Sequence, residues 1–270
     1  MTNENKIRRA QTIQPFGVGS ILDIDGEAFV VNDIFNWKTP NKRVKLQRLE
    51  ESLGFKKLWS FSDFEHEQES LTVTRFPEWY HCPNCDNLRQ ILPNNQGKLI
   101  CINANCDGTA KLSPMRFVAY CSNGHLNDID WFLFAHLDSQ KASTGHCSDY
   151  TKIFYKSTGK YGGDFDQMVV SCKACNAPGQ PLSKLTYKIP RHLVHAKDGQ
   201  ECCGTQPWID KGIMTRDQRN DIAEDCTEEM KREPRGSTSL YHPKIISALD
   251  INFEEIHTYF QRQHLSCLDW

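Results

Sequence analysis

The amino-acid sequence predicts an α+β fold made of small mixed modules that are organised around zinc-ribbon-like metal sites. Twelve cysteines, four of them in two Cys-x-x-Cys pairs, are the candidate ligands. Hydrophobic residues make up only 39% of the chain, at a mean hydropathy of −0.59, so the expected core is thin. Short β-prone runs alternate with a few segments of helical periodicity. Since bound zinc contributes folding free energy that a small core cannot supply, the cysteines and the thin core favour the same architecture.

The first module, residues 1–75, is predicted to be a mixed α/β unit. Two β-prone runs at residues 21–24 and 28–31 flank an Asp-Gly pair, which is typical of a β-hairpin. Residues 41–55 have the pattern of a basic amphipathic helix that ends at a glycine. Residues 71–76 are strand-like and lead into the first Cys-x-x-Cys pair.

The second module, residues 76–113, has the cysteine spacing of a zinc ribbon. Cys82 and Cys85 form one pair, and Cys101 and Cys106 form the other after an intervening fifteen residues. Each pair is expected on a tight turn, so that four thiolates converge on one ion. Zn²⁺ is the predicted metal, with an iron–sulfur centre as the minor competitor because four thiolates suit both.

The third module, residues 114–235, is predicted to be a second Cys/His zinc-binding unit, followed by a helical segment over residues 236–270. A strand is expected at residues 117–120 and another at residues 168–170. The helical patterns in these two modules are at residues 128–137, 216–232 and 242–264.

The ligands of the second module are drawn from scattered cysteines and histidines. The favoured grouping closes one site with Cys172, Cys175, Cys203 and Cys226. A further site would take Cys121, His125 and Cys147, with His136 as the candidate fourth ligand. The alternative is that the two histidines are merely hydrogen-bonded and that Cys147 and Cys226 are buried apolar thiols. Cys202 and Cys267 are expected to be spare.

No catalytic motif accompanies these cysteines. The chain has no phosphate-binding Gly-x-x-x-x-Gly-Lys-Ser/Thr loop and no His-Glu-x-x-His zinc motif. Cys121 and His125 are conceivable as a nucleophile and its base, but no orienting third group or oxyanion site is marked. We therefore expect a protein that is not an enzyme, and keep a cysteine-dependent enzyme as a less favoured alternative.

The charge balance excludes bulk binding of polyanions. The chain has 32 basic and 34 acidic residues, for a net charge of −2. Nucleic acid would have to bind through a local basic surface. The candidate residues lie between aromatic side chains, as in proteins that bind single strands, and are Lys42, Arg43, Lys45 and Arg48. The alternative is a solvated helix face above buried aromatic residues.

The sequence predicts a cytoplasmic protein without a membrane anchor. The polar, basic N-terminus is not followed by the apolar region of a signal peptide. The longest apolar stretch, residues 131–137, is too short to span a bilayer. In a reducing compartment, clustered cysteines bind metal more often than they form disulfides.

Several short motifs follow one another along most of the chain. They are RRAQTIQPFGVGSILD at residues 8–23, RFVAYCSNGHLND at residues 116–128 with Trp131, CGTQPW at residues 203–208, and RGSTSLYHP at residues 235–243 with the Ser-Ala-Leu at residues 247–249. In this order they resemble motifs of DrmB, the accessory protein of the DISARM anti-phage systems. Family members usually continue well beyond the last of these motifs, whereas this chain ends at Trp270. It therefore resembles a shortened or split relative.

The resemblance implies a zinc-binding, non-catalytic partner of a superfamily 2 helicase that helps the helicase to engage invading DNA. The expected partners are a helicase or nuclease subunit of a defence complex, and DNA as a second partner. A standalone protein that binds single-stranded nucleic acid is the alternative from another functional class.

Overall fold

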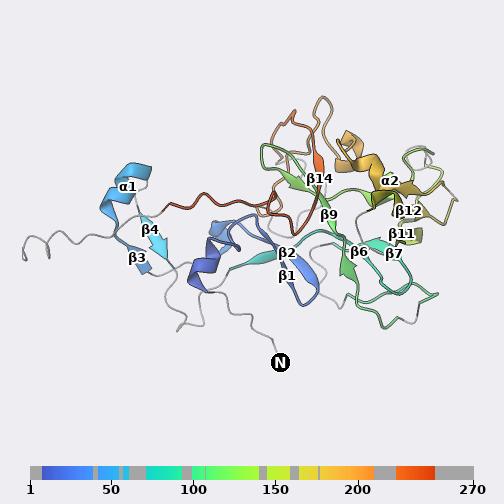
Figure 1. Cartoon of the computed structure of the whole chain (residues 1–270), viewed down its shortest axis with the longest axis horizontal. Helices are drawn as coiled ribbons and strands as arrows, with labels where there is room; N and C mark the ends of the chain where they lie inside the picture. Colours follow the sequence, from blue (N-terminus) through green and yellow to red (C-terminus); the bar gives the residue numbers. More distant parts are fainter. Residues whose placement is uncertain are drawn as a thin grey trace, which may run out of the picture.

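The computed structural model describes most of the chain and has a mixed α+β fold. The described residues are 8–38, 42–54, 57–60, 71–92, 99–106, 108–139, 145–158, 164–175, 177–209 and 223–246. Figure 1 shows small sheets joined by loops and short helices. Cysteine and histidine side chains of the described residues form three groups. The predicted class, small mixed modules with metal-type clusters, is confirmed, although most of the regular structure is β-strand.

The predicted N-terminal hairpin is present. Strands β1 (Ile21–Ile24) and β2 (Glu27–Val31) pair antiparallel, and β5 (Val73–Arg75) adds to the free edge of β2. Asp25 and Gly26 both have positive φ, 51° and 77°, as a two-residue type I′ turn requires. The Asp-Gly signal therefore fixes the register of this hairpin.

The helix predicted for residues 41–55 is shorter than expected. Residues Lys42–Val44 form strand β3, which pairs with β4 (Leu58–Ser60), and helix α1 covers only Gln47–Leu53. Gly54 ends α1 in the left-handed conformation, φ 69°, as the sequence predicts. Cross-strand pairing therefore outweighs helical propensity in the first residues of the segment.

A six-stranded sheet joins the second and third predicted modules. Its order is β13-β12-β11-β7-β6-β8, with β11 pairing both β12 and β7. The strands are β6 (Trp79–His81), β7 (Asn87–Gln90), β8 (Ser113–Pro114), β11 (Ile153–Ser157), β12 (Met168–Cys172) and β13 (Gln180–Pro181). The sheet thus runs across the predicted module boundary at residues 113 and 114.

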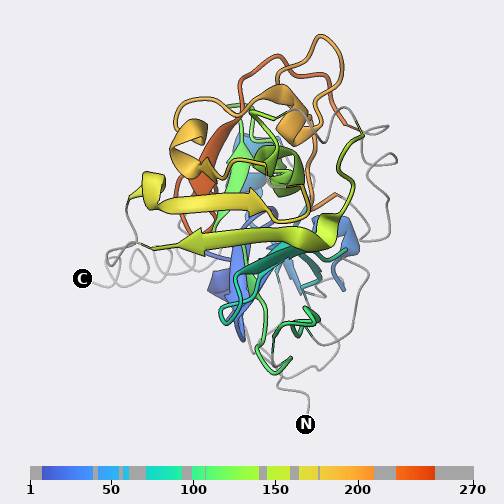
Figure 2. The same ribbon diagram turned by 90° about the vertical axis from the view of Figure 1, so that its right-hand side faces the viewer.

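A smaller sheet and a short helix complete the third module. Strand β9 (Phe117–Tyr120), at its predicted position, lies between β10 (Leu126–Asn127) and β14 (Lys231–Pro234). Helix α2 (Trp131–Ala135) is capped by Asp130, whose carboxylate accepts a hydrogen bond from the Leu133 amide. Figure 2 shows α2 above the long pair β11 and β12.

Two helical predictions near the C-terminus do not hold where the structure describes them. Residues 231–234 are strand β14 and residues 223–230 have no helix, while residues 216–222 lie outside the described residues. Residues 242–246 are likewise not helical, and the remainder of the predicted 242–264 helix lies outside them.

Short 3₁₀ helices connect many of the strands. They are η1 (Arg9–Thr12), η2 (Ile34–Asn36), η3 (Tyr150–Lys152), η4 (Phe165–Gln167), η5 (Leu182–Leu185) and η6 (Arg191–Val194). No helix among the described residues is both long enough and apolar enough to cross a membrane.

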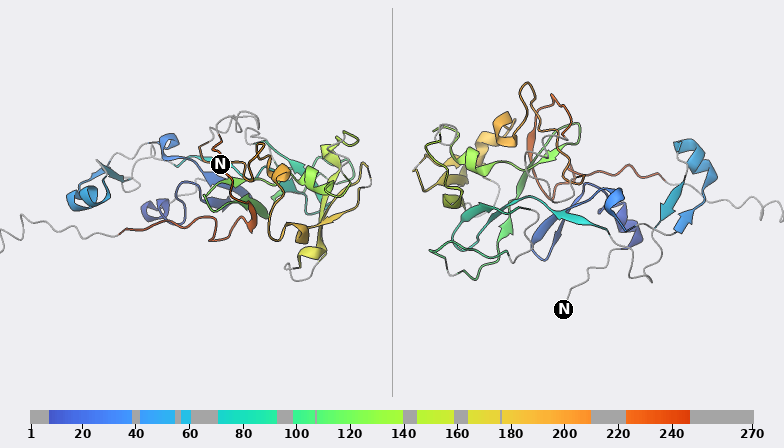
Figure 3. Two further views of the ribbon diagram at one scale, coloured as in Figure 1. Left: turned by 90° about the horizontal axis from the view of Figure 1, so that it is seen from above. Right: turned by 180° about the vertical axis from the view of Figure 1, so that it is seen from behind.

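The main core lies between α2, the six-stranded sheet and the β9 sheet. Trp79, Trp131, Phe117 and Phe134 are its largest fully buried aromatic side chains. The same cluster contains cysteines from both mixed Cys/His groups, whereas the four-cysteine group has a core cluster of its own. The metal-type groups are therefore continuous with the apolar packing. Figure 3 shows α1, β3 and β4 at one end of the molecule, and α2, β11 and β12 at the other.

Candidate metal centres

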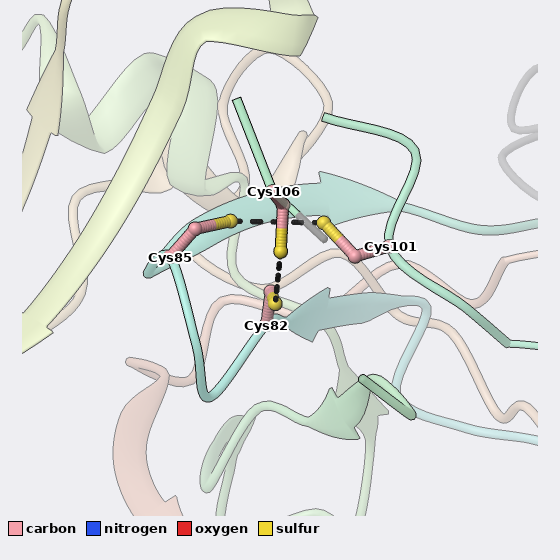
Figure 4. A group of neighbouring side chains, drawn as sticks. All are labelled: Cys82, Cys85, Cys101 and Cys106. Atoms are coloured by element: carbon pink, nitrogen blue, oxygen red, sulfur yellow. Dashed lines mark hydrogen bonds between the residues drawn. The ribbon is translucent and has the colours of Figure 1, made fainter. Parts of the chain in front are cut away.

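The first group consists of the four cysteines of the predicted ribbon, Cys82, Cys85, Cys101 and Cys106. The β6–β7 turn holds one pair, and the turn between Leu99 and Leu112 holds the other. Their Sγ atoms point toward one centre (Figure 4). Cys82 Sγ lies 3.8 Å from Cys106 Sγ, and Cys85 Sγ lies 3.6 Å from Cys101 Sγ. The predicted spacing thus corresponds to a convergent four-thiol site.

Hydrogen bonds shape the two turns of this first group. The Cys82 amide donates to the Asn87 carbonyl, and the Asp86 amide, at φ 60°, donates to the Cys82 carbonyl. The Asn103 side-chain amide donates to Cys85 Sγ at 3.4 Å. Such a donor stabilises a thiolate, so the turn both aims the sulfur and favours its charged form.

The second group brings together Cys121, His125, Cys202 and Cys226. His125 Nδ1 lies 3.4 Å from Cys121 Sγ and 3.5 Å from Cys202 Sγ. Cys121 and His125 lie on one tight turn, in which the Cys121 amide donates to the His125 carbonyl. All four side chains are buried, so the polar ligand atoms face one another rather than water.

Groups around the second site orient its ligands. His125 Nε2, on the far side of the ring from the cysteines, lies 3.3 Å from a carboxylate oxygen of Glu224. The Gly204 amide donates to Cys202 Sγ at 3.3 Å, and the Asn123 side-chain amide donates to Cys226 Sγ at 3.5 Å. A carboxylate on the outer nitrogen of a ligating histidine fixes the tautomer and raises the basicity of the inner nitrogen.

The third group consists of His136, Cys147, Cys172 and Cys175. Cys147 Sγ lies 3.7 Å from Cys172 Sγ, and Cys175 Sγ lies 3.3 Å from His136 Nε2. His136 follows α2, and its Nδ1 is 2.7 Å from the Phe132 carbonyl one turn earlier. With the proton on Nδ1, Nε2 is left as the lone-pair nitrogen that faces the thiols.

The three groups share the dimensions of a tetrahedral site. Within each group all ligand atoms lie within 4.8 Å of one another. An ion about 2.3 Å from sulfur and about 2.0 Å from nitrogen would separate its ligands by roughly 3.5–3.8 Å. The distances of 3.3–3.8 Å between neighbouring ligand atoms match this value and far exceed a disulfide bond of about 2.05 Å. Each group could hold one metal ion.

Burial disfavours the charged thiolate form of several of these cysteines when no cation is bound. It raises the pKa of Cys121 to about 12, that of Cys101 to about 12 and that of Cys172 to about 11. These three thiols would therefore be neutral at pH 7 without a cation, and metal binding would release their protons.

The ligands of the second and third sites are grouped differently from the favoured sequence prediction. Cys172 and Cys175 join Cys147 and His136, whereas Cys226 joins Cys121 and His125. The pairing follows from contacts between distant segments, such as the hydrogen bond from the Cys202 amide to the Cys226 carbonyl, which spacing alone does not reveal.

Neighbouring Cys202 and Cys203 exchange their predicted roles. Cys202, expected to be spare, lies in the second group, and Cys203 lies outside all three. Cys203 Sγ contacts Thr205 Oγ1 at 2.9 Å and Met230 Sδ at 3.7 Å inside the core. Cys267 lies outside the described residues.

The predicted nucleic-acid residues lie on the β3–α1–β4 unit. Arg43, Lys45 and Arg48 are exposed, and Lys42 is the first residue of β3. The predicted amphipathic helix would have placed all four on one helix, but Lys42 and Arg43 belong to the strand. Trp59 of β4 lies opposite Arg43.

Comparison with known proteins places most of this structure within one family. Residues 8–242 match the family described as "Domain of unknown function (DUF8724)". This match covers all three cysteine-rich groups and the β3–α1–β4 unit. No curated protein matches the chain.

Proposed function

The chain belongs to the DUF8724 family, and from this premise we propose that it is a zinc-stabilised, non-catalytic accessory subunit of a prokaryotic anti-phage defence complex. The observation that supports this most is the set of three four-ligand groups. Each ties together segments distant in sequence, most widely in the second group, where Cys121 meets Cys226.

The donor chemistry favours zinc as the metal. One group offers four sulfurs, and each of the other two offers three sulfurs and one imidazole nitrogen. These are the usual ligand sets of structural zinc sites. An iron–sulfur cluster would spread its thiolates over several irons, whereas these ligand atoms surround a single point.

Full coordination by the protein supports a structural role for the metal. A catalytic zinc keeps one position open for water or substrate, and structural sites fill all four positions with side chains. Every group here supplies four ligands, and the mixed groups lie in the core. The proposal is therefore that the ions hold loops in place and that these loops present a surface to another protein.

The resemblance to DrmB identifies the proposed partner as a superfamily 2 helicase, which the chain would help to engage DNA. The test is affinity capture of the tagged chain from its native host at low salt, followed by mass spectrometry. We expect recovery of a helicase or nuclease subunit. Recovery of the chain alone would contradict the accessory role, as would hydrolysis of ATP or cleavage of DNA by the purified chain.

A standalone nucleic-acid-binding zinc protein is the second candidate. It is favoured by the local charge of residues 42–60, which have six basic and two acidic side chains in a chain of net charge −2. The isolated chain should then shift short single strands in a salt-dependent manner.

A further inference from the structure

The β3–β4 pair has one exposed face and one half-buried face. Solvent exposure alternates along the two strands and the residues directly beside them, 45 and 46 after β3 and 57 before β4. The exposed residues are Arg43, Lys45, Lys57 and Trp59. The half-buried residues are Val44, Leu46, Leu58 and Ser60. Because side chains alternate across a strand, the exposed set shares one face. Arg43 is the direct cross-strand partner of Trp59.

This exposed face combines an aromatic ring with three cations. Trp59 keeps 53% of its surface exposed, which is high for an indole, and the Arg43 side chain keeps 40%. The half-buried apolar residues lie on the opposite face, so the Trp59 ring faces solvent on the same side as the cations.

Among the described residues, Glu50 is the acidic side chain that approaches this surface. A carboxylate oxygen of Glu50 lies 3.8 Å from the Arg43 guanidinium and also accepts a hydrogen bond from the Leu58 amide. A half-exposed ion pair at this distance contributes little free energy. A phosphate can therefore compete with Glu50 for Arg43.

We propose that Arg43, Lys45, Lys57 and Trp59 form a binding face for single-stranded nucleic acid, on which a base stacks on Trp59 and the three cations contact phosphates. An exposed indole beside cations fits a strand whose bases are unpaired, because duplex bases offer no free face for stacking. The inference deepens the DNA-engagement part of the proposed function but does not depend on the helicase partner.

Two features distinguish this face from the set predicted by sequence. It adds Lys57 and Trp59, which β4 brings beside β3, and it excludes Lys42, whose cross-strand partner is Ser60 rather than a member of the face. Arg48 lies on α1 rather than on either strand. The proposed face is therefore defined by strand register and not by helical periodicity.

Fluorescence anisotropy of the zinc-loaded full chain with labelled twelve-nucleotide oligo(dT), oligo(U) and a DNA duplex tests the proposal. Both single strands should bind more tightly than the duplex, and the ratio of the two distinguishes DNA from RNA as the natural ligand. Trp59→Ala should weaken binding about 5- to 150-fold without changing its salt dependence. The logarithm of the binding constant falls as the logarithm of salt concentration rises. Arg43→Ala, Lys45→Ala and Lys57→Ala should each make this slope less steep by about 0.7.

Matched substitutions elsewhere serve as controls. Tyr187 is 84% exposed and Lys156 is exposed on β11, so Tyr187→Ala and Lys156→Ala should leave affinity and slope unchanged. Retained zinc content and circular dichroism show that each variant is folded. Absence of binding, or equal losses in the control variants, would overturn the proposal. Helicase capture without strand binding would overturn the proposed binding face and leave the accessory role intact. Strand binding without helicase capture would support the binding face and contradict the accessory role.

Discussion

At the scale of single residues, the second metal-type site depends on side chains that do not themselves provide a ligand. Glu224 faces His125 Nε2 from outside the cluster, while the ring presents Nδ1 to the cysteines. The carboxylate is 68% exposed, so its effect comes from orienting a buried ring rather than from a buried ion pair. Removing an outer partner of this kind commonly weakens metal binding without removing a ligand.

Glu224→Gln should therefore lower the affinity of one of three zinc ions by about 10- to 100-fold. The measurement is release of zinc to a coloured chelator during a stepwise competition. Glu229→Gln is the matched control, because Glu229 pairs with Lys188 rather than with a residue of the second group. Equal release curves for the two variants would show that the Glu224–His125 contact does not tune the site.

Gly204 has a second residue-scale role, because it lets two chain segments approach. It has φ +66°, and a Cβ atom added there would lie 1.8 Å from the Glu224 carbonyl oxygen. Gly199 has a similar φ of +79° but nothing within 4 Å of its added Cβ. Alanine substitutions at these two glycines therefore distinguish the free-energy cost of the left-handed backbone from the cost of a steric clash.

We expect Gly204→Ala to be more destabilising than Gly199→Ala by about 1–3 kcal/mol, the usual range for overpacking. Both variants share the penalty of a left-handed backbone, so the difference reports the contact with Glu224. Denaturant unfolding of the two zinc-loaded variants measures this difference in the free energy of unfolding. Similar midpoints would indicate that the two segments move apart at little cost.

At the scale of elements, the sequence predicts local pairings well and long-range groupings poorly. The hairpin around Asp25 and the ribbon spacing depend on adjacent residues, so short-range patterns suffice. The segment from residue 42 to residue 54 divides into β3 and α1 because β4, outside the window of helical periodicity, pairs with its first residues. Strand β14 likewise owes its conformation to β9 rather than to its own sequence pattern.

The same limit explains the exchanged roles of Cys202 and Cys203. Both are buried, and nothing in the local sequence tells which of them faces Cys121. Cys203, which the sequence predicts as a ligand, directs its thiol toward Met230 instead. Only the packing of the distant Cys226 segment against this turn decides between them.

Substitution of the two neighbouring cysteines tests the grouping directly. Cys202→Ser should reduce bound zinc from three ions to two, as should Cys121→Ser, because each removes a ligand of the second group. Cys203→Ser should retain all three. The measurement is zinc per chain by elemental mass spectrometry, and loss of zinc from Cys203→Ser alone would contradict the assignment. A Cys121→Ser variant that kept its zinc but lost an activity would favour the cysteine-dependent enzyme.

At the scale of the whole molecule, the described helices and many of the described strands are short. The described helices α1 and α2 have seven and five residues, and β8, β10 and β13 have two each. Elements this short have little stability of their own. The core cluster around Trp131 includes cysteines of both mixed groups, so bound ions would stabilise the same region as the apolar packing.

Removal of zinc should therefore unfold the core cooperatively rather than loosen three separate loops. Structural zinc in small domains contributes on the order of 10 kcal/mol per ion at neutral pH, comparable to the whole stability of a typical domain. We expect a strong chelator to abolish the near-ultraviolet circular dichroism that the buried Trp79 and Trp131 give, and restored zinc to recover it. Magnesium at the same concentration is the control, because a hard cation does not suit thiolate ligands. Retention of the aromatic signal after all three ions are lost would mean that apolar packing alone holds the fold, and the proposed structural role of the metal would then be wrong.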